Sequence, residues 1–69
     1  METFDFSEAL SCLKAGMRVA INIKGKERHY YMVDNTIYCV PNNKTFLTYK
    51  VKKFEIDAVL SEDWRLVQE

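Results

Sequence analysis

Basic and aromatic side chains are concentrated in the middle of this 69-residue chain, around its first strand-like segment and the residues that follow. Lysine and arginine hold phosphate groups through charge and hydrogen bonds. Tyrosine rings can stack on bases, which contributes about 1–3 kcal/mol per base in single-strand binders. The alternative is that these tyrosines belong to the core or to a subunit interface. We take as candidate ligand-binding residues Arg18, Asn22, Lys24, Arg28, Tyr30 and Tyr38.

Residues that could carry catalysis are scarce. His29 is the single histidine, and no serine lies in a Gly-x-Ser-x-Gly elbow. The two glycines are too few for a phosphate-cradling loop, and no His, Cys and Asp residues have zinc-ligand spacing. We therefore predict that the chain is not an enzyme, has no catalytic or metal-binding residues and needs no cofactor.

Charge is unevenly distributed although the net charge is zero. Residues 14–53 contain nine basic and two acidic residues, a net charge of +7, and the two flanks carry the balancing −7. A basic middle can collect an anionic ligand on one surface. The neutral total argues against extended nucleic-acid binding, which requires a basic domain.

The elements that would position these residues follow from hydrophobic periodicity. Apolar residues recur at helical spacing from Phe6 to Met17, Asp5 suits the N-cap, and Gly16 suits the end of the helix. This pattern predicts a helix over residues 6–15.

The pattern then changes to the period of two that is typical of strands. Residues 17–24 alternate, and residues 29–33 and 36–40 are rich in Tyr, Val, Ile and Thr. We predict turns at residues 24–28, 34–35 and 41–44, a fourth strand over residues 45–51, a short helix near residues 54–60 and a brief strand at residues 64–67. The whole is a single α+β domain of two layers: an N-terminal helix, an antiparallel meander of about four strands, and a short C-terminal helix and strand.

Length and composition indicate a small protein that assembles with itself. A chain of 69 residues buries a small core, and such domains often gain stability by forming oligomers. Two cysteines, Cys12 and Cys39, are too few for a secreted disulfide scaffold, so two reduced thiols are expected, with a Cys12–Cys39 disulfide as the alternative. No signal peptide or membrane-spanning run is visible, which predicts a cytosolic location and no membrane partner.

Three stretches of the chain together resemble a known family. Residues 5–10 read Asp-Phe-Ser-Glu-Ala-Leu and lead through residues 13–16 to Arg18-Val19, and residues 56–67 contain Glu62-Asp63-Trp64. This resembles the short phage proteins of the second Thoeris anti-defence family, whose members open with FSEAL and LK-x-G-x-x-V and close with DIL-x-x-DWE-V. The resemblance covers about half the chain. It implies a compact α+β subunit in a dimer or tetramer that binds a cyclic nucleotide or cyclised ADP-ribose signal, and so acts as a sponge.

One departure from that family concerns the binding residues. Family members commonly carry Arg-x-Gly-Trp after the first strand, whereas residues 21–26 here read Ile-Asn-Ile-Lys-Gly-Lys. No family binding residue is carried over at that point, and another ring such as Tyr30 would have to stack on the ligand. Two further hypotheses stay open: an inhibitor that binds a host enzyme through a sheet edge or an apolar patch, and a single-stranded nucleic-acid binder.

Overall fold

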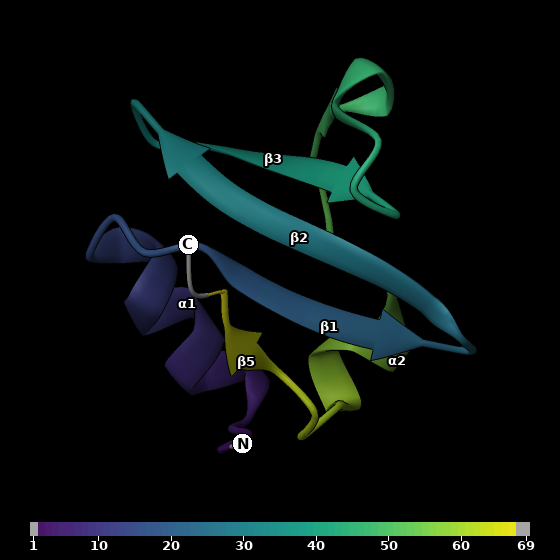
Figure 1. Cartoon of the computed structure of the whole chain (residues 1–69). Coiled ribbons are helices and arrows are strands. Elements are labelled where there is room, and N and C mark those ends of the chain that lie inside the picture. Colours follow the sequence, from purple (N-terminus) through teal and green to yellow (C-terminus); the bar gives the residue numbers. More distant parts are fainter. Residues whose placement is uncertain (1, 68–69) are drawn as a thin grey trace.

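The computed structural model describes residues 2–67, which form one antiparallel sheet and two α-helices (Figure 1). The strands lie in the order β4-β3-β2-β1-β5, so β5 returns from the C-terminal end to pair with β1. This confirms the predicted α+β architecture. In chain order the elements are α1 Phe6–Lys14, β1 Val19–Ile23, β2 Lys26–Val33, β3 Thr36–Pro41, the 3-10 helix η1 Thr45–Leu47, β4 Tyr49–Lys50, α2 Ile56–Leu60 and β5 Arg65–Leu66.

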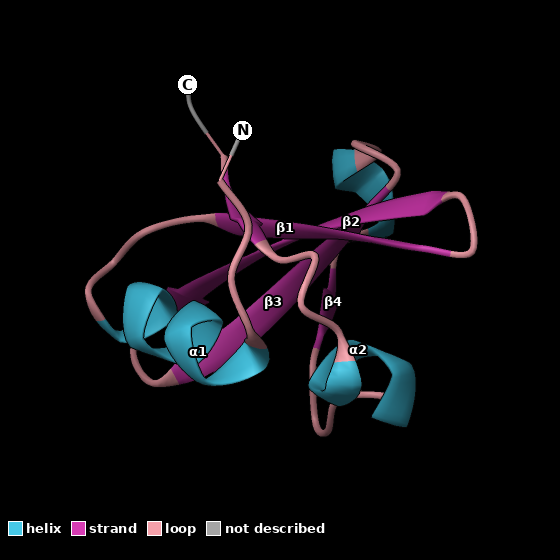
Figure 2. Cartoon of the chain, turned by 90° about the horizontal axis from the view of Figure 1, so that it is seen from below, coloured by secondary structure: helices cyan, strands magenta, loops and turns pink. Residues whose placement is uncertain are grey.

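Both α-helices pack on the same face of the sheet, as Figure 2 shows from below. The core lies between these two layers and is built from side chains that alternate along the strands with outward-facing ones. Trp64 is fully buried at its centre, and its indole Nε1 donates a hydrogen bond to the carbonyl oxygen of Ala58 at 2.9 Å. The other buried members of this cluster are Ala9, Leu13, Val19, Ile21, Ile23, Tyr30, Cys39 and Ala58.

Helix α1 has a capping interaction at each end. The Asp5 side chain accepts a hydrogen bond from the backbone N–H of Glu8 at 2.9 Å. At the other end Gly16 has φ +85°, and the N–H of Met17 donates to the carbonyl oxygen of Cys12 at 2.9 Å. These are the features of a Schellman motif, and they confirm the predicted boundaries of the helix to within one residue.

Two tight hairpins set the register of the central strands. Asp34 and Asn35 both have positive φ, at 50° and 64°, which confirms the predicted two-residue turn between β2 and β3. The turn between β1 and β2 is shorter than predicted, because Lys24 and Gly25 alone form it and β2 begins at Lys26.

The predicted strand over residues 45–51 is wrong for most of its length. Asn42 and Asn43 both have positive φ, and the chain then forms η1, which satisfies its backbone groups locally. The N–H of Leu47 donates to the carbonyl oxygen of Lys44, and the Thr48 hydroxyl donates to that of Thr45. Only Tyr49 and Lys50 pair with β3 as a strand. The alternating apolar residues in this segment therefore did not mark a buried face.

Neither helix within residues 2–67 combines the length and the apolar composition that a membrane crossing requires. Both cysteines are free thiols, with Cys39 buried in the core and Cys12 half-buried on α1. This is the reduced state that the sequence favoured.

Candidate functional site

The sheet face that lies away from the helices is the candidate functional surface, and we call it the open face. Residues that are direct partners in a strand ladder point to the same face of the sheet, so the pairings show which side chains share the open face. The centre of the open face is sheltered, because Ala20 is fully buried and Val40 is 6% exposed. Around this centre the open face carries Asn22, Glu27, His29, Tyr31, Tyr38, Lys50 and Arg65, with Arg18 over the Tyr31 ring.

An aromatic pair with a cation beside it occupies one end of the open face. Tyr31 and Tyr38 are direct partners in the β2–β3 ladder, and their rings stack with centroids 5.4 Å apart and planes inclined by 22°. The guanidinium carbon of Arg18 lies 5.2 Å from the centroid of the Tyr31 ring, which is a cation–π distance. Lys50 pairs with Tyr38 in the next ladder. The row thus combines half-buried aromatic rings with positive charge at both ends.

Two hollows adjoin this part of the molecule, with Val67 in the lining of both. The first, the Arg18 hollow, has a volume of about 460 Å³ and is lined by Gly16, Arg18, Tyr31, Met32 and Val67. The second, the Glu27 hollow, has a volume of about 670 Å³ and is lined by Glu2, Phe4, Glu27, His29, Arg65, Leu66 and Val67. Both volumes fall within the range of roughly 300–1,000 Å³ that small-molecule sites occupy.

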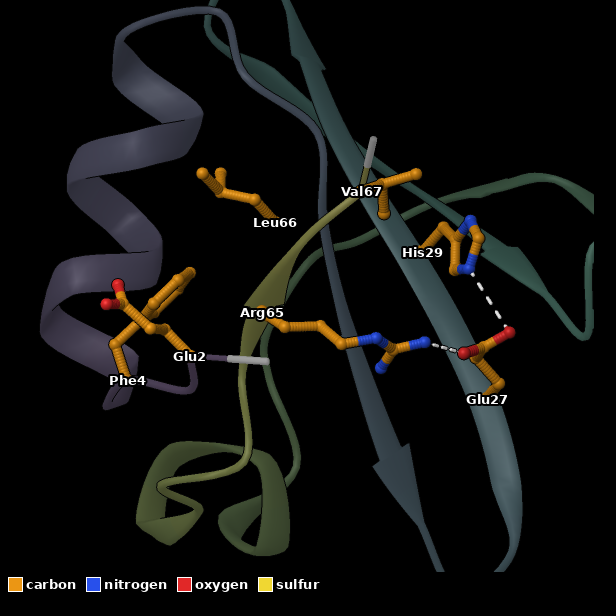
Figure 3. A pocket seen from close by; sticks show the side chains of 7 residues that line it. All are labelled: Glu2, Phe4, Glu27, His29, Arg65, Leu66 and Val67. Carbon is orange, nitrogen blue, oxygen red and sulfur yellow. Dashed lines mark ion pairs between the residues drawn. The ribbon is translucent and has the colours of Figure 1, made fainter. Parts of the chain in front are cut away.

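A carboxylate with two partners lies in the Glu27 hollow, as Figure 3 shows. Arg65 reaches from β5 to form an ion pair with Glu27, and the Nε2 atom of His29 lies 3.3 Å from the other carboxylate oxygen. Burial, and after it the charge of Arg18, lowers the pKa of His29 even though Glu27 is close. The imidazole is therefore mainly neutral at neutral pH, and Glu27 is held by one full positive charge.

A third cavity lies on the opposite, helix-covered side and contains two of the predicted residues. It has a volume of about 260 Å³ and is lined by Arg28, Tyr30, Phe54, Glu55 and the 49–53 segment. Arg28 Nη1 donates to Glu55 Oε1 at 3.1 Å. Burial works to lower the pKa of Arg28, but hydrogen bonding to Tyr30 and Glu55 outweighs it and raises that pKa. Arg28 thus has a local structural partner.

The six residues predicted from the sequence do not form one site. Arg18, Asn22 and Tyr38 lie on the open face, and Arg18 and Tyr38 flank Tyr31 there. Lys24 lies in the β1–β2 turn, where its Nζ atom is 3.8 Å from a carboxylate oxygen of Asp57.

The other two predicted residues, Arg28 and Tyr30, lie on the helix-covered side of the sheet. Tyr30 was expected to stack on the ligand, but it belongs to the core. Its ring is 2% exposed and packs against the rings of Phe54 and Trp64, with centroids 5.2 Å and 5.3 Å away. Burial, and next the neighbouring Cys39, raises its pKa. The ring offers no free surface for stacking, and on the open face Tyr31 takes that position.

Five residues of the open face are not among the six residues predicted from the sequence: Glu27, His29, Tyr31, Lys50 and Arg65. Three of these residues could be predicted from a two-residue turn at Lys24-Gly25, because such a turn places residues 27, 29 and 31 on the outward face of β2. Comparisons of the chain with protein-family models, with curated proteins and with solved structures find no match.

Proposed function

We propose that this protein binds a nucleotide signal on its open face and holds it without chemical change. The observation that carries the proposal is the stacked Tyr31–Tyr38 pair, with Arg18 over one ring, beside a hollow of about 460 Å³. Aromatic rings can contact a base, and an arginine can hold a phosphate in the same ligand. This arrangement brings together, on one surface, the two kinds of contact that a nucleotide needs.

The resemblance to the second Thoeris anti-defence family suggests which nucleotide is bound and what its binding achieves. The ligand would be a cyclic nucleotide or a cyclised ADP-ribose made by a bacterial immune enzyme, and its capture would keep the immune effector inactive. The protein would work in the cytoplasm of the infected cell as a phage-encoded dimer or tetramer. Sequestration needs affinity alone, and rigid strands that hold the side chains in advance reduce the ordering cost of binding.

Calorimetry tests this function against a panel of cyclic dinucleotides, cyclic trinucleotides and cyclised ADP-ribose isomers. We expect submicromolar binding of at least one panel member, followed by recovery of that ligand intact after the protein is denatured. Recovery of a cleaved product would contradict sequestration, and the absence of binding across the panel would contradict nucleotide recognition.

An apolar stripe on α2 favours a second candidate function, the binding of a host protein. Ile56 and Leu60 are 68% and 73% exposed, and Val59 lies beside them at helical spacing. Exposed apolar residues gathered on one helix face are typical of protein–protein contact sites. If this function holds, a variant carrying Ile56→Ser and Leu60→Ser loses capture of a host protein, whereas Phe46→Ser, at another exposed apolar residue, retains it.

A further inference from the structure

The Glu27 hollow differs in charge from the Arg18 hollow beside it. Within the described residues 2–67, the lining of the Glu27 hollow contains two carboxylates, Glu2 and Glu27, and one guanidinium, that of Arg65. His29 is mainly neutral at neutral pH, because burial and the charge of Arg18 lower its pKa. With one positive and two negative groups, the lining that residues 2–67 provide has a net charge of −1, whereas in the other hollow these residues provide one charged group, that of Arg18. The larger hollow is therefore a poor environment for a phosphate.

The position of Glu27 within the hollow suits it to accept hydrogen bonds. One carboxylate oxygen faces Arg65 and the other faces His29, so the carboxylate is held from both sides (Figure 3). A carboxylate oxygen has more than one lone pair, and each oxygen can accept a further hydrogen bond. Phe4, Leu66 and Val67 provide apolar surface elsewhere in the lining of the same hollow. A neutral group that carries hydrogen-bond donors matches such a lining.

We infer that Glu27 accepts hydrogen bonds from the nucleoside part of the ligand, either from the ribose 2′-hydroxyl or from an exocyclic amine of the base; this inference rests on the proposed function. Carboxylates recognise both groups in other nucleotide and nucleic-acid sites, where they accept from ribose hydroxyls and from base amines. Glu27 is then a residue that determines specificity.

The difference in charge between the hollows also orients the ligand. Glu2 and Glu27 repel phosphate from the larger hollow, whereas Arg18 attracts it to the smaller one. Since Val67 lines both hollows, a ligand that places one base on the Tyr31–Tyr38 pair and its phosphate near Arg18 can extend a second nucleoside or ribose past Val67 toward Glu27. The opposite orientation would bring a phosphate into the hollow whose described lining has a net negative charge.

Titrations followed by amide NMR spectra test the inference with three simple probes at millimolar concentration. AMP carries both donor groups, 2′-deoxy-AMP lacks the 2′-hydroxyl, and IMP lacks the exocyclic amine. We expect AMP to shift the amide signals of Glu27, His29 and Arg65. One of the two altered probes should bind roughly three- to tenfold more weakly than AMP, and its identity shows which donor Glu27 contacts.

Variants at two paired carboxylates provide the matched control. Glu27→Gln should remove the difference between AMP and the weaker probe, whereas Glu55→Gln, whose parent carboxylate pairs with Arg28 outside the hollow, should preserve it. The comparison of the three probes on the unaltered protein stands even if a variant fails to fold.

Equal binding of all three probes, or shifts confined to residues outside the Glu27 hollow, would overturn the assignment of Glu27. Tight binding of a panel nucleotide in calorimetry would still support the proposed function in that case. The failure of the inference is therefore distinguishable from the failure of the function.

Discussion

Tyr31 and Tyr38 stack across the β2–β3 ladder with their ring centroids 5.4 Å apart. Their positions are fixed by the backbone, because the Asp34-Asn35 turn sets the register that makes them direct partners. The pair therefore has its geometry before any ligand arrives. A preformed aromatic surface loses little conformational entropy on binding.

The stacking of this pair should also be measurable as a coupling in stability. Cross-strand aromatic pairs contribute about 0.5–1.5 kcal/mol beyond the area that they bury. We expect the double-mutant cycle of Tyr31→Ala and Tyr38→Ala, measured by urea unfolding, to give a coupling free energy of about that size. Additive effects of the two substitutions would show that the rings do not interact in solution.

Removal of the α1 N-cap should weaken the helix. Asp5→Ala leaves the Glu8 N–H without its side-chain acceptor and should lower the free energy of unfolding by about 1 kcal/mol. Asp5→Ser is the control, since serine can accept the same hydrogen bond and should recover most of the loss. An equal loss in both variants would assign the effect to the charge of Asp5 and not to capping.

Substitution of Trp64 should be costly because its indole is both packed and hydrogen-bonded. Trp64→Phe keeps an aromatic ring but removes the indole donor to the carbonyl oxygen of Ala58, which then accepts only from the Ser61 N–H at 3.3 Å. The lost hydrogen bond and the smaller ring should together lower the free energy of unfolding by about 1–3 kcal/mol. Phe46→Leu, at a ring that is 81% exposed, should change stability little. A neutral Trp64→Phe would mean that the hydrogen bond contributes nothing to the fold.

His29 should make stability depend on pH in the mildly acidic range. Burial and the charge of Arg18 lower its pKa in the folded protein, so the unfolded chain binds the proton more readily. Stability is therefore complete above the ordinary histidine pKa of about 6.5 and falls as the pH decreases below it. His29→Gln should flatten this dependence between about pH 7 and pH 5.5. If stability rises on acidification in this range, Glu27 dominates the titration of His29 instead.

Much of the fold could be predicted because local signals and periodicity agreed. Asp5 and Gly16 marked the ends of α1, and Asp34-Asn35 marked a hairpin whose residues both adopt positive φ. The prediction for residues 45–51 was wrong because alternating apolar residues there favour a strand. In the structure, the turn at Asn42-Asn43 directs the chain into η1 and leaves Phe46 exposed. A period of two cannot by itself show that a face is buried.

The candidate site was harder to predict because it depends on the length of one turn. A turn over residues 24–28 leaves the orientation of β2 undetermined, so the sequence does not show which of Tyr30 and Tyr31 faces away from the core. The two-residue turn at Lys24-Gly25 pairs Val19 with Tyr30, which places Tyr30 on the core face. Arg65 joins Glu27 only because β5 pairs with β1, a long-range contact that no local pattern indicates.

Two tyrosine variants, titrated with the tightest-binding nucleotide of the panel, test most directly whether ligand binds the open face. Tyr38→Ala removes a ring from the open face, whereas Tyr49→Ala removes a half-exposed ring from β4 on the other face. We predict that Tyr38→Ala weakens binding about tenfold or more, as the loss of a stacking contact would, and that Tyr49→Ala binds like the unaltered protein. Unchanged affinity in Tyr38→Ala, or an equal loss in Tyr49→Ala, would contradict binding on the open face.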